Sequence, residues 1–298
     1  MEATDAVLII DKKVGFSSAQ VVAKVKAITK AGKAGHAGTL DPFASGVLVC
    51  CLNRATRLAQ YLLSDEKQYR AVLRLGITTD TLDNTGRVVD KKPVPQITAD
   101  QMASVLQRYT GQLMQTPPLF SALKHQGKPL YYWARKGTPV QKKGRQVTIT
   151  ALEATGVELP DVTLDITCSA GTYIRQLGFD IGRTLGCGGH LTRLARLRSG
   201  MFALKQALTL EQLESAVKAQ TLGSCLVQPA DALYHMAEHM ADELLTRKVI
   251  HGRLLTFKDG FGVKHRSPFK IVSSDRKLLA IVEADKTTDR LKYRAVFI

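Results

Sequence analysis

The chain has 298 residues, of which 45% are hydrophobic, so it is longer than one typical domain and can bury a large core. Lys and Arg outnumber Asp and Glu by 42 to 26, and the resulting net charge of +16 favours a polyanionic partner, nucleic acid before membrane. The acidic N-terminus and the lack of an apolar run of about 18 residues argue against a signal peptide and a membrane span, so a cytoplasmic protein is expected.

The first third of the chain combines short apolar runs with amphipathic helices. Strands are predicted in three places, at 6–10, 46–52 and 69–75. A helix is predicted over 19–29, because Val21, Val25 and Ile28 recur at helical spacing, and another over 55–63.

The middle of the chain continues this mixture. Thr98 and Gln101 have the spacing of a capping box and predict a helix start, and Ile174, Leu177 and Ile181 predict a helix after the turn at 171–173. The other predictions here are a turn and strand at 82–89, a loop at 115–137 that ends in a short aromatic-rich helix, and a strand at 162–168. Because there is no regular βαβ rhythm, the expected fold class is α+β, a mixed α/β fold around a largely antiparallel sheet.

The pattern of predicted secondary structure changes near residues 227–233. Short strands are predicted beyond it, at 252–257, 269–273, 278–284 and 293–298. We therefore expect two domains, 1–230 and a small β-rich domain at 231–298. The first domain carries a net charge of +12 and the second +4. Most of the positive charge that would attract a polyanionic partner is therefore expected on the larger domain.

Several kinds of site lack their motifs. The glycine-rich stretch 31–38 does not have the G-x-x-x-x-G-K-[ST] pattern of a phosphate-binding loop, and no G-x-S-x-G elbow is present. The five cysteines form no C-x-x-C pair, and the seven histidines form no H-x-x-x-H pair with a nearby acid. No metal and no cofactor are therefore predicted, and the thiols are expected to be reduced.

The segment 35–46, "GHAGTLDPFASG", surrounds one acid, Asp41, with small and turn-forming residues. Gly38 can adopt backbone angles that other residues avoid, and Pro42 pushes Asp41 towards an extended conformation. The pattern predicts a stiff loop that presents one carboxylate at the start of a buried strand. An aspartate that merely caps a turn through its own side chain is the alternative.

Other candidates also have two interpretations. Tyr69 begins a strand on its apolar face, where a core tyrosine is the common outcome. Arg175 lies one turn into an apolar helix and could be a solvated arginine or the partner of a buried carboxylate. Arg193, Arg196 and Arg198 form a dense basic stretch that fits either phosphate contacts or a solvated face.

The motif "GHAGTLDPFASGVLVCCLNRATRL" resembles the catalytic-aspartate motif of the TruB family, the bacterial tRNA pseudouridine-55 synthases. Segments 8–18, 67–86, 115–137 and 168–194 match further motifs in family order, so the resemblance spans about residues 8 to 200. Two departures are Lys13, where the family usually has proline, and Asn53, where glycine is common. The last 65 or so residues match weakly and by analogy resemble a PUA-type RNA-binding domain.

The resemblance implies a role for each matching residue. Asp41 is similar to the catalytic carboxylate, Tyr69 to the aromatic residue that stacks on the target base, and Arg175 to the arginine that pairs with the aspartate. An arginine in that position favours the ionised carboxylate. Attack on uracil C6, attack on ribose C1′ and removal of a ribose proton all agree with a carboxylate there.

Three more positions are implied to line the site. Tyr173 and Leu194 match the walls of the base pocket, and His36 matches the histidine that fills space near the vacated base stack. The implied activity is isomerisation of uridine to pseudouridine at position 55 in the TΨC loop of tRNA, by base flipping, glycosidic-bond breakage and re-attachment through C5. The protein is expected to act as a monomer.

Two other functions stay open. A guide-RNA-dependent synthase of the archaeal or eukaryotic kind is the first alternative, although the chain lacks long basic extensions. A non-catalytic RNA-binding or RNA-folding protein is the second, and the intact set of Asp41, Tyr69 and Arg175 argues against it.

Overall fold

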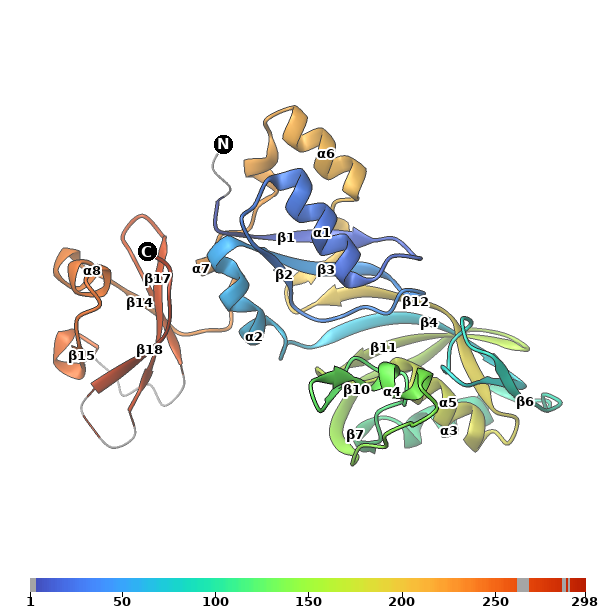
Figure 1. Ribbon diagram of the computed structural model, residues 1–298. Helices are drawn as coiled ribbons and strands as arrows, with labels where there is room; N and C mark the ends of the chain where they lie inside the picture. Colours follow the sequence, from blue (N-terminus) through green and yellow to red (C-terminus); the bar gives the residue numbers. More distant parts are fainter. Residues whose placement is uncertain (1–3, 262–267, 286–287, 289) are drawn as a thin grey trace.

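A computed structural model describes residues 4–261, 268–285, 288 and 290–298. It contains a large sheet in the main body and a smaller sheet, formed by the C-terminal residues, that lies at one end of the molecule (Figure 1). The predicted mixed fold around a largely antiparallel sheet, followed by a β-rich C-terminal part, is confirmed.

The large sheet has nine strands, and its main path runs β1-β3-β12-β4-β11-β10-β7. The strands on this path are β1 (Ala6–Lys12), β3 (Ser45–Leu52), β12 (Gly189–Ser199), β4 (Lys67–Leu75), β11 (Asp161–Cys168), β10 (Arg145–Glu158) and β7 (Gly111–Gln115). Two short strands extend it, β2 (Ala34–His36) on β3 and β13 (Phe202–Ala203) on β12. Neighbouring strands are antiparallel except β3 and β12, which run parallel.

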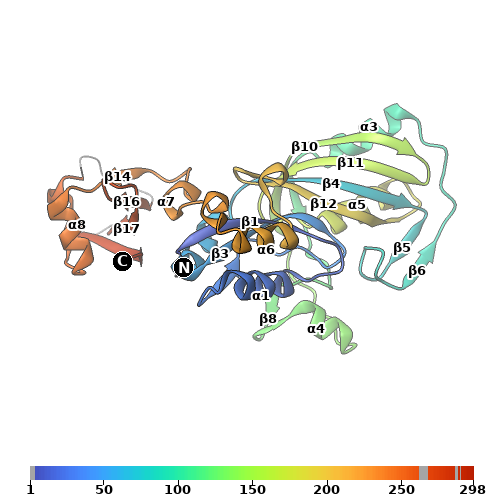
Figure 2. The ribbon, with the colours of Figure 1, turned by 90° about the horizontal axis from the view of Figure 1, so that it is seen from above.

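Helices cover both halves of this sheet, as Figures 1 and 2 show. Two helices, α1 (Ser18–Thr29) and α6 (Leu210–Lys218), pack on β1 and β3, where Val21, Val25 and Leu213 share a buried cluster. Two others, α3 (Ala99–Arg108) and α5 (Ile174–Thr184), belong to the core of the other half, with Leu73 and Leu177 at its centre. Each buried stripe is the one that the helical spacing predicts, apart from Ile28, which is only half-buried.

Several other elements are shorter. They are α2 (Ala59–Leu62), the hairpins β5 (Ile77–Thr79) with β6 (Val88–Lys91) and β8 (Lys124–His125) with β9 (Lys128–Pro129), and α4 (Leu130–Arg135). In Figure 2, β8 and α4 stand out from the main body, and β5 with β6 lies at the end opposite the C-terminal sheet. The aromatic-rich helix predicted at the end of the 115–137 loop is α4.

The C-terminal sheet has the order β14-β16-β17-β18-β15. Its strands are β14 (Glu238–Met240), β16 (Phe269–Val272), β17 (Leu278–Ala284), β18 (Arg290–Val296) and β15 (Leu255–Thr256), and the helices α7 (Pro229–Ala232) and α8 (Glu243–Ile250) accompany them. The buried amine of Lys270 on β16 donates to the carbonyls of Ala230 and Leu233, at 2.6 and 3.2 Å. This amine therefore ties the C-terminal sheet to the segment that leaves the main body.

Three features differ from the predictions. The predicted helix over 55–63 is a 3₁₀ turn at Asn53–Leu58 followed by the short α2. The predicted strand at 252–257 is limited to β15, and the helix α8 precedes it. The long strands β10 and β12 were not anticipated. Their alternation is interrupted by register shifts, which hide the strand period in the sequence.

The parallel contact between β3 and β12 depends on Gly46. Gly46 lies opposite Arg196 and has a φ of +98°, and a Cβ built there would lie 2.2 Å from the Arg196 carbonyl oxygen. Only glycine meets both conditions, because it tolerates this φ and leaves room for the neighbouring backbone.

Gly46→Ala should therefore destabilise the protein by more than about 2 kcal/mol, since overpacking and a forbidden φ act together. Urea unfolding followed by circular dichroism measures this change. Gly15→Ala is the matched control, because Gly15 has a φ of +92° but no neighbour within 4 Å of the added Cβ. Equal losses in the two variants would show that the close approach at Gly46 costs nothing.

Candidate active site

Asp41 lies in the loop between β2 and β3, and its position is fixed through the backbone around it. Ser18, at the start of α1, accepts from the Leu40 amide at 2.8 Å and donates to the Leu40 carbonyl at 3.0 Å. The amide of Gly15 donates to the Pro42 carbonyl at 2.8 Å. These bonds hold the residues on both sides of Asp41, so its half-buried carboxylate has little freedom to move.

Arg175 on α5 is the partner of this carboxylate. Its Nε donates to Asp41 Oδ2 at 2.8 Å, and its side chain is 4% exposed against 36% for Asp41. Its other nitrogens donate to the carbonyls of Thr81, at 2.6 Å, and Phe120, at 2.8 Å, and Nη1 lies 3.6 Å from the buried carboxylate of Asp83. The guanidinium thus joins four chain segments and holds a positive charge against Asp41.

A cavity of about 550 Å³ opens beside this pair, and we call it the Tyr69 cavity. The predicted residues that line it are Asp41, Tyr69, Tyr173, Arg175 and Leu194. Tyr69 is half-buried on β4, and burial raises the pKa of its hydroxyl, so the ring is held as a neutral aromatic surface. The volume is in the range of small-molecule sites.

His36 lines a second cavity of about 510 Å³, which shares Asp41 and Arg175 with the first. We call it the His36 cavity. Burial lowers the pKa of His36, with a smaller contribution from Arg196, which favours a neutral ring. The Nδ1 of His36 is buried without a hydrogen-bond partner among the described residues. The Asp41–Arg175 pair therefore stands at the division between two adjoining cavities.

Several residues that position the site were not identified from the sequence. Gln115, at the end of β7, accepts from the Tyr173 amide at 2.8 Å and donates to the Tyr173 carbonyl at 3.0 Å. This paired contact fixes the residue that caps α5. The capping box of Ser17 and Gln20 indicates the start of α1. The hydrogen bonds between the Ser18 hydroxyl and the Leu40 backbone have no signal in the sequence.

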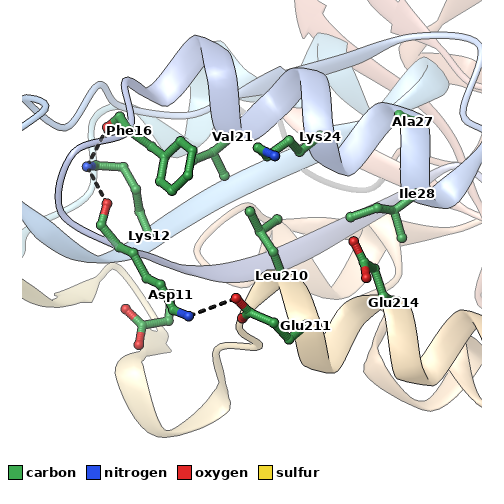
Figure 3. A pocket seen from close by; sticks show the side chains of 11 residues that line it. Asp11, Lys12, Phe16, Val21, Lys24, Ala27, Ile28, Leu210, Glu211 and Glu214 are labelled. Atoms are coloured by element: carbon green, nitrogen blue, oxygen red, sulfur yellow. Dashed lines mark hydrogen bonds and ion pairs between the residues drawn. The ribbon is translucent and has the colours of Figure 1, made fainter.

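Two buried lysines add positive charge around Asp41. Burial lowers the pKa of Lys12 to about 8, although the Asp41 carboxylate opposes this shift. The amine of Lys12 donates to the Phe16 carbonyl at 2.7 Å (Figure 3). Burial likewise lowers the pKa of Lys67, which lines the Tyr69 cavity, to about 8. Lys13, at the position where proline was expected, pairs instead with Glu211 at 2.8 Å on α6.

The three arginines of the basic stretch are separated by the structure. Arg196 is 1% exposed and donates to the carbonyls of Val47 and Gly38, so its guanidinium binds backbone atoms inside the protein, and its phosphate contact stays a prediction. Arg198 is half-buried and pairs with Glu66 at 2.7 Å. Only Arg193 is exposed, and it lines a polar cavity that shares no residue with the Tyr69 cavity.

The site combines one carboxylate with the buried guanidinium groups of Arg175 and Arg196 and with aromatic and aliphatic walls. Among the residues that the structure describes, no group of three or more His, Cys, Asp or Glu side chains is placed to hold a metal ion. No helix in the same described part is long and apolar enough to cross a membrane. A carboxylate in such a cavity can act as a nucleophile or a base on a flat ring held against the aromatic walls.

Known proteins resemble this chain over nearly its whole length. Residues 26–174 match the description "TruB family pseudouridylate synthase (N terminal domain)", and residues 175–246 match "tRNA pseudouridylate synthase B C-terminal domain". A Burkholderia lata protein named tRNA pseudouridine synthase B is 45% identical over 252 residues, which are 84% of this chain and 77% of the relative. A Francisella tularensis subsp. novicida protein of the same name is 40% identical over 287 residues, which are 95% and 92% of the two chains.

A solved structure has the same arrangement of elements. The crystal structure of a Cbf5–Nop10–Gar1 complex contains a chain that is 28% identical, with a TM-score of 0.79 over 100% of this chain and 86% of that one. The two-sheet architecture, and not only the segment around Asp41, is therefore common to both.

Proposed function

The chain belongs to the TruB family of pseudouridylate synthases, and from this membership we propose that it converts the uridine at position 55 in the TΨC loop of tRNA into pseudouridine. Isomerisation of a tRNA uridine is the activity named for relatives that match most of the chain. The observation that carries the proposal further is the Asp41 carboxylate, held by Arg175 at the wall of the Tyr69 cavity.

The residues that line the Tyr69 cavity have different roles in this reaction. The target base leaves its stack at a cost of a few kcal/mol, and a base–aromatic contact with Tyr69 returns about 1–3 kcal/mol. The bond between uracil N1 and ribose C1′ breaks, the uracil turns, and C5 joins C1′ while its hydrogen leaves to solvent and N1 gains one. Tyr173 and Leu194 confine the detached uracil, and Asp41 faces the sugar–base junction.

Tritium release tests the proposal directly. A tRNA transcript labelled with tritium at uridine C5 is incubated with the protein alone, without guide RNA or added protein. Release is expected from the wild-type transcript and not from one in which position 55 is changed. Product and substrate have the same mass, so loss of the C5 hydrogen is the informative signal.

Other outcomes would identify a different function. Release only after addition of guide RNA and partner proteins would indicate a guide-dependent synthase. Tight tRNA binding with no release under either condition would indicate an RNA-binding protein. Release from the transcript changed at position 55 would show that the protein acts on another uridine.

The remaining proposals concern organisation. We divide the chain into a catalytic domain at 1–230 and a PUA-like RNA-binding domain at 231–298, supported by the separate C-terminal sheet. We further expect a monomer that works in the cytoplasm on the TΨC stem-loop. The net charge of +16 supports binding of the RNA backbone.

Arg193 is the exposed member of the basic stretch and the one that can reach a phosphate. Arg193→Gln should weaken tRNA binding and reduce the slope of log affinity against log salt by about 1, because one phosphate contact is lost. Filter binding at four salt concentrations measures the slope. An unchanged slope in a variant with normal thermal unfolding would remove Arg193 from the RNA surface.

A further inference from the structure

Arg145 is a cation of the Tyr69 cavity that was not identified from the sequence. It is the first residue of β10, is half-buried, and lines the cavity together with Asp41, Tyr173 and Arg175. The centre of its guanidinium lies 4.8 Å from the centre of the Tyr173 ring, which is a cation–π contact. It therefore belongs to the wall beside Tyr173.

The other cations of this cavity each donate at least two hydrogen bonds to the protein itself. Arg175 is bonded to Asp41 and to two carbonyls, and Arg196 to two carbonyls. Lys67 donates to the carbonyls of Leu63 and Asp65. These bonds hold the protein's own loops in place.

Among the described residues, Arg145 forms fewer hydrogen bonds than any of these three. Its Nη2 donates to the Gly171 carbonyl, and its Nε is buried without a partner among the described residues. No acidic side chain in the described part of the chain forms an ion pair with it. A half-buried guanidinium without a counter-charge is unfavourable unless an anion arrives with the ligand.

The local backbone holds this guanidinium in place. Gly171 has a φ of +84°, and a Cβ built there would lie 3.1 Å from the guanidinium carbon of Arg145. One face of the guanidinium is thus covered by the turn before α5 and another part by the Tyr173 ring. A flat cation held in this way is pre-organised for a ligand that accepts hydrogen bonds in the plane of its fork.

We propose that Arg145 binds one of the two backbone phosphates that flank the flipped uridine. Uracil is neutral and offers only carbonyl oxygens, whereas a phosphate supplies the missing negative charge and suits the guanidinium fork. A phosphate at the Arg145 wall would leave the uracil free to lie against Tyr69, next to Asp41. This inference rests on the proposed function, because it names how the same cavity holds its nucleotide.

A double-substitution cycle tests the contact. Synthetic T-arm stem-loops carry a neutral methylphosphonate in place of the phosphate on the 5′ or the 3′ side of the target uridine, and affinity is measured by fluorescence anisotropy. For wild type, one of the two replacements should weaken binding by about 10- to 100-fold, as should Arg145→Gln on unmodified RNA. That replacement should then change the affinity of Arg145→Gln by no more than about 2-fold.

Two further variants separate this contact from general effects. Arg145→Lys keeps the charge but loses the planar fork, so its affinity should lie between wild type and Arg145→Gln. Arg183→Gln is the matched control, because Arg183 also lies over an aromatic ring, Phe179 at 5.8 Å, but does not line the cavity. It should bind as wild type does.

The proposal is overturned if both methylphosphonates weaken Arg145→Gln as much as wild type, or if Arg145→Gln binds normally. Circular dichroism melting identifies a variant that fails to fold, and Arg145→Lys then completes the cycle. The readout is affinity and not turnover, so it is independent of the tritium assay. A wild-type protein that releases no tritium but shows the coupling would contradict the proposed reaction and leave the phosphate contact in place.

Discussion

Asp41→Asn should reduce tritium release from labelled tRNA by at least about 10⁴-fold, because it removes the one carboxylate that faces the Tyr69 cavity in contact with Arg175. The substitution keeps the shape of the side chain and one oxygen that can accept from Arg175. It removes the charge and the nucleophilic or basic oxygen pair. Single-turnover tritium release with enzyme in excess measures the chemical step without product release.

Binding should be nearly unchanged in the same variant. Phosphate contacts dominate the affinity of RNA-binding proteins, and Asp41 makes none. Asp165→Asn is the matched control, because Asp165 also pairs with an arginine, Arg70 at 2.7 Å, but does not line the Tyr69 cavity. It should retain turnover. Normal turnover in Asp41→Asn would remove Asp41 from the chemistry, whatever the family resemblance implies.

The helices and strands that the sequence predicts best are those in which the spacing of apolar residues is regular from end to end. The stripe of Val21 and Val25 is buried against the sheet, and Thr98 and Gln101 form the capping box that their spacing predicts. On β4, Ala71, Leu73 and Leu75 face one core as the alternation indicates. In each case one local rule agrees with the tertiary environment.

The strand β12 shows why some elements could not be predicted from the sequence. Its register shifts between Leu191 and Arg193 and again between Arg196 and Arg198, so the alternation of inward and outward side chains changes along the strand. In addition, Arg196 points inward. A buried arginine that binds carbonyls looks in the sequence like one more surface charge.

The site was partly predictable for a different reason. The motif around Asp41 is local, but its partner Arg175 lies 134 residues away, and their pairing came from family resemblance and not from spacing. Arg175 also donates to the backbone carbonyls of Thr81 and Phe120. Every residue has a backbone carbonyl, so the residue types at 81 and 120 do not predict these contacts. Arg145 follows two lysines and a glycine, a run that looks like a solvated basic loop.

Arg175 has two roles that can be separated. It faces Asp41 in the cavity, and it also neutralises Asp83, whose side chain is 6% exposed. Asp83 itself accepts from the hydroxyls of Thr81 and Thr85, at 2.7 and 2.6 Å, and orders the turn that carries the Thr81 carbonyl. Loss of Arg175 therefore leaves one half-buried and one buried carboxylate without their cation.

Arg175→Gln should lower the free energy of unfolding by about 3–5 kcal/mol, the usual result of removing one partner of a buried ion pair. Turnover should fall by at least about 100-fold in the variant protein that remains folded, because Asp41 loses both its orientation and its counter-charge. Urea unfolding gives the first value, and single-turnover tritium release at low temperature gives the second. Arg175→Lys should fold better but remain slow, since an amine cannot reach Asp41 and the two carbonyls in the guanidinium geometry.

The double variant Arg175→Gln with Asp83→Asn separates the two roles. An asparagine at 83 keeps an oxygen for Thr81 and Thr85 but carries no charge, so the unpaired buried carboxylate disappears and much of the lost stability should return. Turnover should stay low, because nothing has been restored next to Asp41. If turnover recovered together with stability, the effect of Arg175 on catalysis would be only structural. If neither recovered, Asp83 would not be the reason that the guanidinium is needed for folding.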